Sequence, residues 1–376
     1  MAAETARKSH GHRSAQKAWK RGWKAGYGLG ANYGYHLGRC EAVIKQTPPP
    51  PAPCWDARIL YVTSGKPMPY PPLEMSVGQA LSGMVREVIT VGPDADIAAV
   101  AEQHMPDAVL VLEGFYVAAE QLERVRALGI RTAIWLTDDP YYTNVTINLV
   151  KNYDYVFTLE LACVSLYQQH GCPRVFYLPF AANPAVFTPK PVPVHYRRDI
   201  NFLGSAYWHR VAFFNRMTRF LAARNTYISG LWWDRLPEYH LLAHKISLNH
   251  WLEPEETAGY YNGAKVVINL HRAVYDPTMN DNTELIAAVS PNPRTFEICA
   301  CGTLQLVDVR SDLSRFYTPG VEIVTYASAD ELMEKIDYYL QHEEERQEIA
   351  LNALRRTRME HTYQHRLAQL LQTFLG

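Results

Sequence analysis

One short segment of the chain combines a predicted helix start, a helix end and two charged side chains. Asn292 can cap free backbone amides and Pro293 suits the first helical position, so we expect a helix to begin there and Gly302 to end it. A helix N-terminus carries about half a positive charge, which suits an anion such as the diphosphate of a nucleotide sugar. Arg294 and Glu297 are expected on its exposed turn. This segment is the strongest candidate for binding chemistry.

Glu297 has two interpretations. It lies about one turn into the predicted helix, where its carboxylate would suit the diol of a ribose. A lone glutamate more often only pairs with a nearby arginine on a solvated helix face. The surroundings have to decide between the two.

A second group of residues suits a bound nucleotide. Gly204 and Ser205 follow an apolar run and open a turn into a predicted helix that carries Arg210. Glycine lets backbone amides approach a phosphate, and arginine adds a bidentate charge-assisted contact. His271 follows another predicted strand and is expected to line the same crevice. Trp232 also follows a strand, where an indole can stack on a nucleobase, although packing in the core explains it equally well.

Two adjacent carboxylates are the candidates for a general base. Asp138 and Asp139 end a predicted strand and would lie at the mouth of a cleft, as a base and its orienting neighbour. An aspartate that caps the following helix, with Pro140 in its first turn, is an equally good explanation. Glu113, at the end of the preceding strand, is a weaker alternative base.

Strand and helix patterns alternate from residue 58 onward, which is typical of a parallel sheet with helices on both faces. The proline-rich segment 183–198 interrupts the alternation and is interpreted as an interdomain linker. The apolar runs before it are 59–62, 88–91, 108–112, 132–136, 155–158 and 175–178; those after it are 200–203, 227–229, 266–270, 304–307 and 322–325. Helices are predicted over 330–341, 343–360 and 363–374.

Residues 1–45 differ from the rest of the chain. They are basic and carry a glycine at every fourth position from Gly22 to Gly38, which places the glycines near one helical stripe. Each glycine costs a helix about 1 kcal/mol, so this helix would need to dock on something. A docking helix or a self-association helix is favoured over a disordered basic arm or a contact with nucleic acid or surface polysaccharide, and self-association would join two copies of the chain as a homodimer. The prolines of 48–53 form a stiff linker.

Composition limits the possible functions. The 376 residues exceed one compact core and predict two domains. A formal net charge of -1 gives no bulk field for nucleic acid, so no nucleic-acid partner is expected. The six cysteines lack metal-type spacing and are interpreted as reduced core thiols. No membrane span or secretion signal is recognised, which favours a cytoplasmic location.

The order and spacing of several motifs over residues 55–376 resemble the CgeB-like spore-maturation glycosyltransferases, which have the GT-B fold. The matching segments are Asp199–Ser205 with Arg210, Tyr260–His271, Arg294–Asp308, Tyr338–Leu340 and His361–Tyr363 with Arg366. The resemblance implies an α/β protein of two facing Rossmann-like doubly wound domains, with a C-terminal crossover helix and, here, a helical N-terminal extension. The implied units are an extension and linker (1–54), an acceptor-side domain (55–190, completed by 361–376) and a nucleotide-sugar-binding domain (191–360).

The same resemblance implies an activity. A sugar would pass from a nucleotide-sugar donor to a glycan or polysaccharide of the cell or spore surface, without a metal or other cofactor. Retaining relatives in the wider GT-B group often carry two glutamates eight residues apart; Glu297 matches the second, but the first position is Val289. The stereochemical outcome therefore stays open, as do two alternatives: a non-catalytic spore-coat or assembly protein, and a nucleotide-sugar epimerase.

Overall fold

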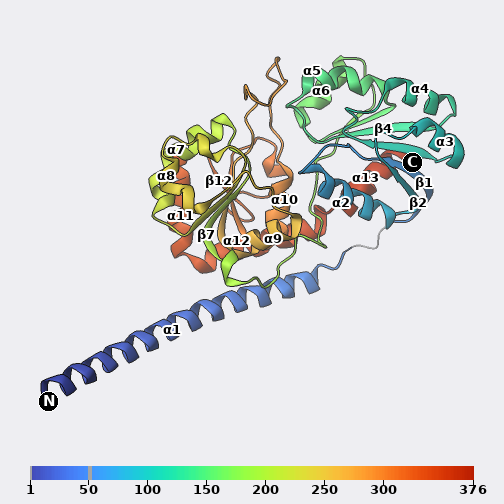
Figure 1. Cartoon of the computed structure of the whole chain (residues 1–376). Coiled ribbons are helices and arrows are strands. Elements are labelled where there is room, and N and C mark those ends of the chain that lie inside the picture. The colour runs from blue at the N-terminus through green and yellow to red at the C-terminus, as the bar shows by residue number, and fades with distance from the viewer. Residues whose placement is uncertain (1, 50–52) are drawn as a thin grey trace.

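The computed structural model describes residues 2–49 and 53–376, apart from the side chains of 2–15, 25 and 29. Two α/β domains lie next to each other, and a long N-terminal helix projects from one of them (Figure 1). We call them the N-terminal and C-terminal domains. Each is built on a parallel six-stranded sheet.

The sheet of the N-terminal domain has the strand order β2-β1-β3-β4-β5-β6. Its central strands are apolar along their whole length because helices cover both faces; every residue of β3 is buried. The order reverses between β1 and β3, and ligands of such sheets bind beyond the carboxyl ends of strands at this switch point. The elements are β1 (Trp55–Val62), α2 (Tyr70–Ser82), β2 (Val85–Val91), α3 (Ile97–His104), β3 (Ala108–Leu112), α4 (Ala119–Ala127), β4 (Arg131–Leu136), α5 (Thr143–Leu149), β5 (Tyr155–Thr158), α6 (Leu161–Gln169) and β6 (Val175–Tyr177).

The sheet of the C-terminal domain has the order β12-β11-β10-β7-β8-β9, with its switch point between β7 and β10. Three-residue β9 was not predicted from the sequence. The elements are β7 (Arg198–Leu203), α7 (Trp208–Ala222), β8 (Thr226–Gly230), α8 (Tyr239–Leu242), β9 (Ile246–Leu248), α9 (Pro254–Gly263), β10 (Ala264–Asn269), α10 (Pro293–Ala300), β11 (Leu304–Asp308), β12 (Val324–Tyr326) and α11 (Ala329–Gln341).

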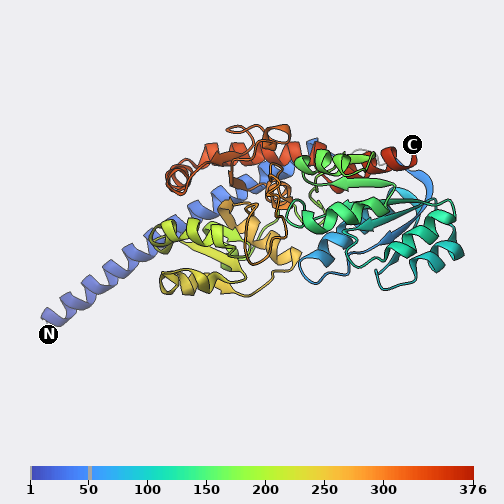
Figure 2. The same ribbon diagram turned by 90° about the horizontal axis from the view of Figure 1, so that it is seen from above.

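After β1 the chain crosses between the domains twice. After the C-terminal domain, α12 (Glu343–Glu360) leads to α13 (Tyr363–Leu375), which packs on α2 in the core of the N-terminal domain. Figure 2 shows these helices lying across both domains. The two crossing segments are hydrogen-bonded to each other: Ala182 N donates to His361 O (3.0 Å), and Tyr363 N donates to Ala182 O (3.2 Å). The crossings therefore lie side by side.

The helix α1 (Ala2–Gln46) docks on this chain by its second half. Cys40 and Val43 pack against α12, and His36 donates to Gly302 O (2.8 Å). The glycine stripe takes no part in this docking, since a Cβ at any position from Gly22 to Gly38 would have nothing within 4 Å. Nearby aromatic side chains are also uncovered, because Trp19, Trp23 and Tyr27 are 61–67% exposed.

Five of the six cysteine thiols are buried and unpaired, which matches the interpretation as core thiols. Cys54 is the exception, because its side chain is exposed.

Candidate functional site

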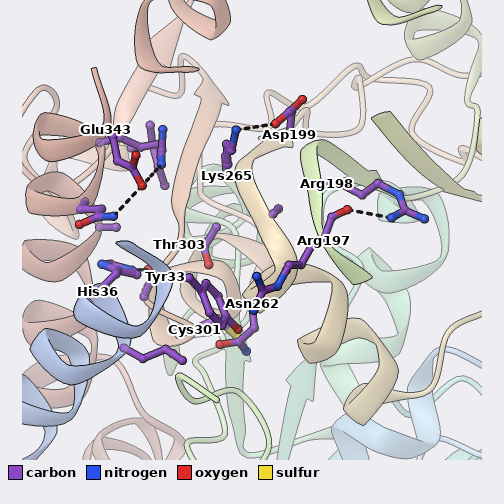
Figure 3. Close-up of a pocket in the computed structure, with 18 of the residues that line it drawn as sticks. Tyr33, His36, Arg197, Arg198, Asp199, Asn262, Lys265, Cys301, Thr303 and Glu343 are labelled. Atoms are coloured by element: carbon purple, nitrogen blue, oxygen red, sulfur yellow. Dashed lines mark hydrogen bonds and ion pairs between the residues drawn. The ribbon is translucent and has the colours of Figure 1, made fainter. Parts of the chain in front are cut away.

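Two adjoining cavities lie between the domains, at the carboxyl ends of both sheets. The larger, of about 340 Å³, is lined mainly by the C-terminal domain. The smaller, of about 240 Å³, reaches Asp138 and Asp139 of the N-terminal domain. They share the lining residues Pro69, Leu73, Tyr207, Arg210, Asn292, Pro293 and Arg294, so they form one interdomain cleft. A further cavity, shown in Figure 3, lies at the opposite end of the C-terminal sheet.

Arg210 lies where the C-terminal sheet reverses its order. Its buried guanidinium donates to Ser205 O (2.9 Å) and Leu270 O (2.6 Å), in the loops that follow β7 and β10. Its Nε has no partner among the described residues. Burial, and then the nearby charge of Arg294, lower the pKa of Arg210 to about 9. This cation therefore has backbone partners but no carboxylate partner in the described chain.

Gly204 lets a second guanidinium approach the first. Arg294 donates to Leu203 O (2.6 Å) across the glycine. A Cβ added at Gly204 would lie 2.7 Å from one nitrogen of Arg294, closer than real Cβ atoms are found, and 3.1 Å from one nitrogen of Arg210, which is a tight contact. The sequence predicted Gly204, Ser205 and Arg210 as a phosphate loop, and the structure places all three in the larger cavity with Arg294.

The helix α10 begins at the cleft, as the sequence predicted. The side chain of Asn292 accepts a hydrogen bond from Thr295 N (3.1 Å), and Pro293 follows as the first helical residue. Because this cap uses one amide and Pro293 has none, the first turn offers fewer free N–H groups than we expected. A bound anion would rely on Arg210 and Arg294 in addition to the helix dipole.

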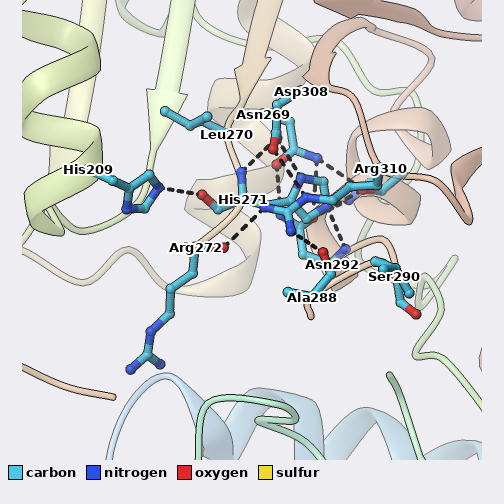
Figure 4. Close-up of polar contacts among 12 residues, drawn as sticks. His209, Asn269, Leu270, His271, Arg272, Ala288, Ser290, Asn292, Asp308 and Arg310 are labelled. Carbon is cyan, nitrogen blue, oxygen red and sulfur yellow. Dashed lines mark hydrogen bonds and ion pairs between the residues drawn. The ribbon is translucent and has the colours of Figure 1, made fainter. Parts of the chain in front are cut away.

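His271 supports this helix start from behind (Figure 4). Its Nε2 accepts from Asn292 N (3.0 Å), so its Nδ1 carries the proton and donates to Asp308 (2.6 Å). Burial lowers the pKa of His271. Although His271 is among the residues around the smaller cavity, both ring nitrogens have protein partners. His271 therefore lines the cleft, as expected, and its hydrogen bond positions Asn292.

Asp308 connects His271 to a neighbouring loop. Arg310 donates to Asp308 (3.2 Å) and to Arg272 O (3.1 Å), as Figure 4 also shows. Burial alone would raise the pKa of Asp308, but His271 and Arg310 outweigh it and hold this pKa below its usual range. The network fixes the loop after β10 and the start of α10 relative to each other.

Glu297 is half-buried and lines the larger cavity, so the prediction that it lies on an exposed turn is wrong. Arg294 donates to Leu203 O, and the carboxylate of Glu297 makes no hydrogen bond or ion pair with any described residue. Burial raises the pKa of Glu297 to about 7, while Arg294 acts against this rise. The simple explanation, an arginine pair on a solvated face, is therefore not what the structure shows.

Trp232 does not line either cleft cavity, which corrects its proposed place at a nucleobase. The guanidinium of Arg235 lies over its ring, 4.6 Å from the centroid. Trp251 was not predicted from the sequence. It is 37% exposed and lines the larger cavity together with His250. Both follow the short strand β9, whose three residues carry too little periodicity to be recognised.

Asp138 is held by a polar cluster at the switch point of the N-terminal sheet. Its carboxylate accepts from Lys66 Nζ (3.2 Å) and from the hydroxyl of Tyr70. Lys66 also donates to Glu113 (2.6 Å), which is buried and lines neither cleft cavity. The side chain of Asp138 stays 20% exposed and faces the smaller cavity. Glu113 therefore orients Lys66, and Asp138 is the accessible carboxylate.

Asp139 differs from its neighbour. It is 2% exposed and accepts from Thr158 Oγ1 (2.5 Å) and Tyr167 OH (2.7 Å). Burial raises the pKa of Asp139 to about 7. The alternative of a helix cap is not observed, because the residue before α5 is Tyr142.

Comparisons of the chain with known proteins show which family it belongs to. A family model described as "Glycosyl transferase-like" matches residues 210–372. The chain is 30% identical over 295 residues to the spore protein CgeB of Bacillus subtilis (strain 168), a match that covers 78% of this chain and 91% of that protein. The chain belongs to the CgeB-like family of glycosyltransferases.

Solved structures confirm the predicted GT-B fold of this CgeB-family chain. Sucrose-phosphate synthase from Thermosynechococcus elongatus matches with a TM-score of 0.57 and 12% identity, over 84% of this chain and 98% of that one. The Anabaena protein HepE, in complex with UDP and glucose, matches with a TM-score of 0.58 and 12% identity, over 84% of this chain and 99% of that one. The prediction of a glycosyltransferase is confirmed. Within the described residues, no helix combines the length and the apolar character that a membrane crossing requires.

The CgeB-family chain also joins its two domains near Val289. The carboxylate of Glu160, from the N-terminal domain, accepts from Val289 N and Ser290 N, each at 3.1 Å. Thr143 Oγ1 donates to Asn282 (2.8 Å) further along the same loop. Where the wider GT-B group often carries its first glutamate, this chain offers a backbone amide that binds the other domain.

Proposed function

We propose that this glycosyltransferase takes its sugar from a nucleoside diphosphate sugar held by the C-terminal domain and passes it to a glycan or polysaccharide held against the N-terminal domain. One observation carries the proposal. Arg210 and Arg294, which have no carboxylate partner among the described residues, and Glu297, whose carboxylate has no donor among them, line one cavity of about 340 Å³. Pockets of this size hold small organic ligands.

Each of these groups has a part in donor binding. Arg210 and Arg294 pair with the diphosphate and stabilise the charge that it gains as it leaves, which is why the proposal needs no metal. Glu297 accepts hydrogen bonds from the ribose hydroxyls. Trp251, beside the same cavity, offers a face for the nucleobase. HepE, whose structure contains UDP, makes UDP-sugars the first donors to test.

The acceptor side supplies the base. If the reaction inverts the anomeric carbon, Asp138 removes the proton from the acceptor hydroxyl, because it is the accessible carboxylate in the smaller cavity. Asp139 fixes the end of β4 through Thr158 and Tyr167. The relative's name, spore protein, supports a spore-surface glycan as the acceptor and association with the spore.

The test is to incubate the purified chain with UDP-, GDP- and TDP-sugars and to follow both nucleotide and sugar. A transferase releases the nucleotide, faster when an acceptor glycan is present. An epimerase changes the sugar while the nucleotide stays attached. A non-catalytic assembly protein changes neither, and that result contradicts the proposal.

We also propose that the free half of α1 pairs two copies of the chain. Its aromatic side chains are uncovered, and from residue 5 to residue 40 it carries basic residues but no Asp or Glu. Exposed acidic residues of α12 include Glu344, Glu345 and Glu348; α12 packs against the docked half of α1, where Glu348 pairs with Arg39. An antiparallel pairing centred on Gly30 brings each basic half toward the acidic end of the other copy. It also sets glycine against glycine, because the stripe is symmetric about Gly30.

The mass in solution tests this pairing. Gly30→Leu is expected to give a monomer by light scattering, because its side chain enters the paired face. Gly28→Leu is the matched control: two residues away, it points to the opposite side of the helix, and it also has nothing within 4 Å. A wild-type monomer, or equal effects of both substitutions, contradicts the pairing.

A further inference from the structure

A separate cavity of about 240 Å³ lies at the amino ends of the strands in the C-terminal sheet, away from the cleft (Figure 3). Helix α1, helix α12 and the amino ends of the strands β7, β10 and β11 enclose it. Tyr33 and His36 come from α1, Arg197 and Arg198 come from the start of β7, and Arg346 comes from α12. The cavity therefore exists only while α1 is docked.

Two buried polar atoms around this cavity lack partners among the described residues. His36 Nε2 donates to Gly302 O (2.8 Å), which leaves Nδ1 as an acceptor without a donor. Burial lowers the pKa of His36, so the ring is neutral and this acceptor is retained. Arg197 Nε is a donor without an acceptor. Buried groups of this kind are rare unless a water or a ligand completes them.

The charges around the cavity do not balance. Its two carboxylates already have partners: Asp199 pairs with Lys265 (2.8 Å) and Glu343 pairs with Arg346 (3.4 Å). Arg197 and Arg198 have no carboxylate partner among the described residues. The guanidinium of Arg197 lies over the ring of Tyr33, 4.1 Å from its centroid, which holds it in place. The surplus charge is positive.

We propose that this cavity is a second ligand site for a small polyhydroxylated anion, either a sugar phosphate or a sugar acid. The proposal rests on the cavity itself, on its unpartnered donor and acceptor, and on the surplus of positive charge around it. The anionic group pairs with Arg197, since guanidinium binds phosphate and carboxylate alike. A hydroxyl donates to His36 Nδ1. The volume is near the low end of ligand pockets, which suits one sugar ring.

Binding at this site has a structural consequence. The ligand contacts α1 and the C-terminal domain together, so it stabilises the docked state of α1 and not the undocked one. Amide hydrogen exchange in residues 33–46 is therefore expected to slow when the site is filled, without a change in the cleft.

Calorimetry on the full chain tests the proposal. Glucose 6-phosphate and glucuronate are the two charged probes, with glucose and inorganic phosphate as controls, all in saturating UDP so that the cleft is occupied. At least one charged probe is expected to bind at least ten times more tightly than glucose or phosphate. Whichever binds identifies the anion.

Variants place the binding at this cavity. Arg197→Gln is expected to weaken the charged probe at least tenfold, and His36→Phe to weaken it while the melting temperature stays within a few degrees. Arg197→Lys keeps the positive charge and should retain part of the affinity. This variant shows whether the loss in Arg197→Gln comes from the missing charge or from misfolding. Arg219→Gln, an exposed arginine elsewhere, is the control. No binding of either probe, equal binding in Arg197→Gln, or phosphate binding as tightly as the sugar anions overturns the proposal.

Discussion

The switch points of the two sheets carry similar residues in opposite states of pairing. In the N-terminal domain, Lys66 forms ion pairs with both Glu113 and Asp138. In the C-terminal domain, Arg210 and Arg294 meet backbone carbonyls and no described carboxylate. A paired cluster holds its members in fixed geometry, whereas unpaired charges gain most from a charged ligand. The comparison assigns positioning of the reaction to one domain and binding of the donor to the other.

The largest expected effect tests the paired cluster. Asp138→Asn keeps the shape but removes the base, so kcat should fall by about 10²- to 10⁴-fold while donor affinity is unchanged. Steady-state kinetics and calorimetry measure the two separately. Asp56→Asn, on an exposed carboxylate in the same domain, is the control. Full activity of Asp138→Asn removes this residue from the reaction.

Glu113→Gln tests whether the cluster is held together by its charges. It removes the buried partner of Lys66 and leaves Lys66 paired with Asp138 alone, so the folding free energy should fall by about 1 to 3 kcal/mol, the cost of one lost hydrogen bond to a charged group. Denaturant unfolding measures the loss. If stability is unchanged, the cluster does not depend on its pairing and the contrast with the C-terminal domain fails.

Arg294→Gln is the counterpart in the C-terminal domain. It removes a cation that only a ligand neutralises, so donor affinity should fall by about 10- to 100-fold, as for one charge-assisted hydrogen bond. Folding stability should stay the same or rise, because the repulsion of Arg210 is relieved. Calorimetry with a UDP-sugar and thermal unfolding give both quantities, and a large loss of stability with unchanged affinity would reverse the comparison.

The smallest expected effect is a pH dependence from Glu297. Because burial raises its pKa to about 7, the carboxylate that accepts the ribose hydroxyls forms only as pH rises through 7, and UDP-glucose should bind several-fold more tightly at pH 8 than at pH 6. The same raised pKa lowers the free energy of unfolding as the pH rises from the ordinary pKa of a glutamate to about 7, because the folded state holds its proton over this range and the unfolded state does not. Glu297→Gln should abolish the pH dependence of UDP-glucose affinity and of folding stability. If the pH dependence of affinity is unchanged in this variant, Glu297 is not the group that causes it.

The sequence predicted those features that depend on local chemistry. The cap at Asn292, the first-turn Pro293 and most strands of both sheets follow from residue type and periodicity, and the structure contains them. The short strand β9 has no such pattern, and so Trp251 was missed while Trp232 was chosen.

Features that depend on distant contacts were not predictable. Asp138 and Asp139 are neighbours, and only Thr158 and Tyr167, brought in by other elements, decide which is buried. Glu297 looked exposed because the sequence shows one helix face, not the cavity wall that Tyr363 of α13 completes. In both cases the burial of a carboxylate is set by residues far away in the chain.

The hydrogen bonds between Ala182 and the 361–363 segment have a mechanical consequence. Two connections that run side by side and are tied together bend readily in one direction but resist torsion. A swing about this seam would move the far rim most, and there it would separate Thr143 from Asn282, which are hydrogen-bonded in this structure.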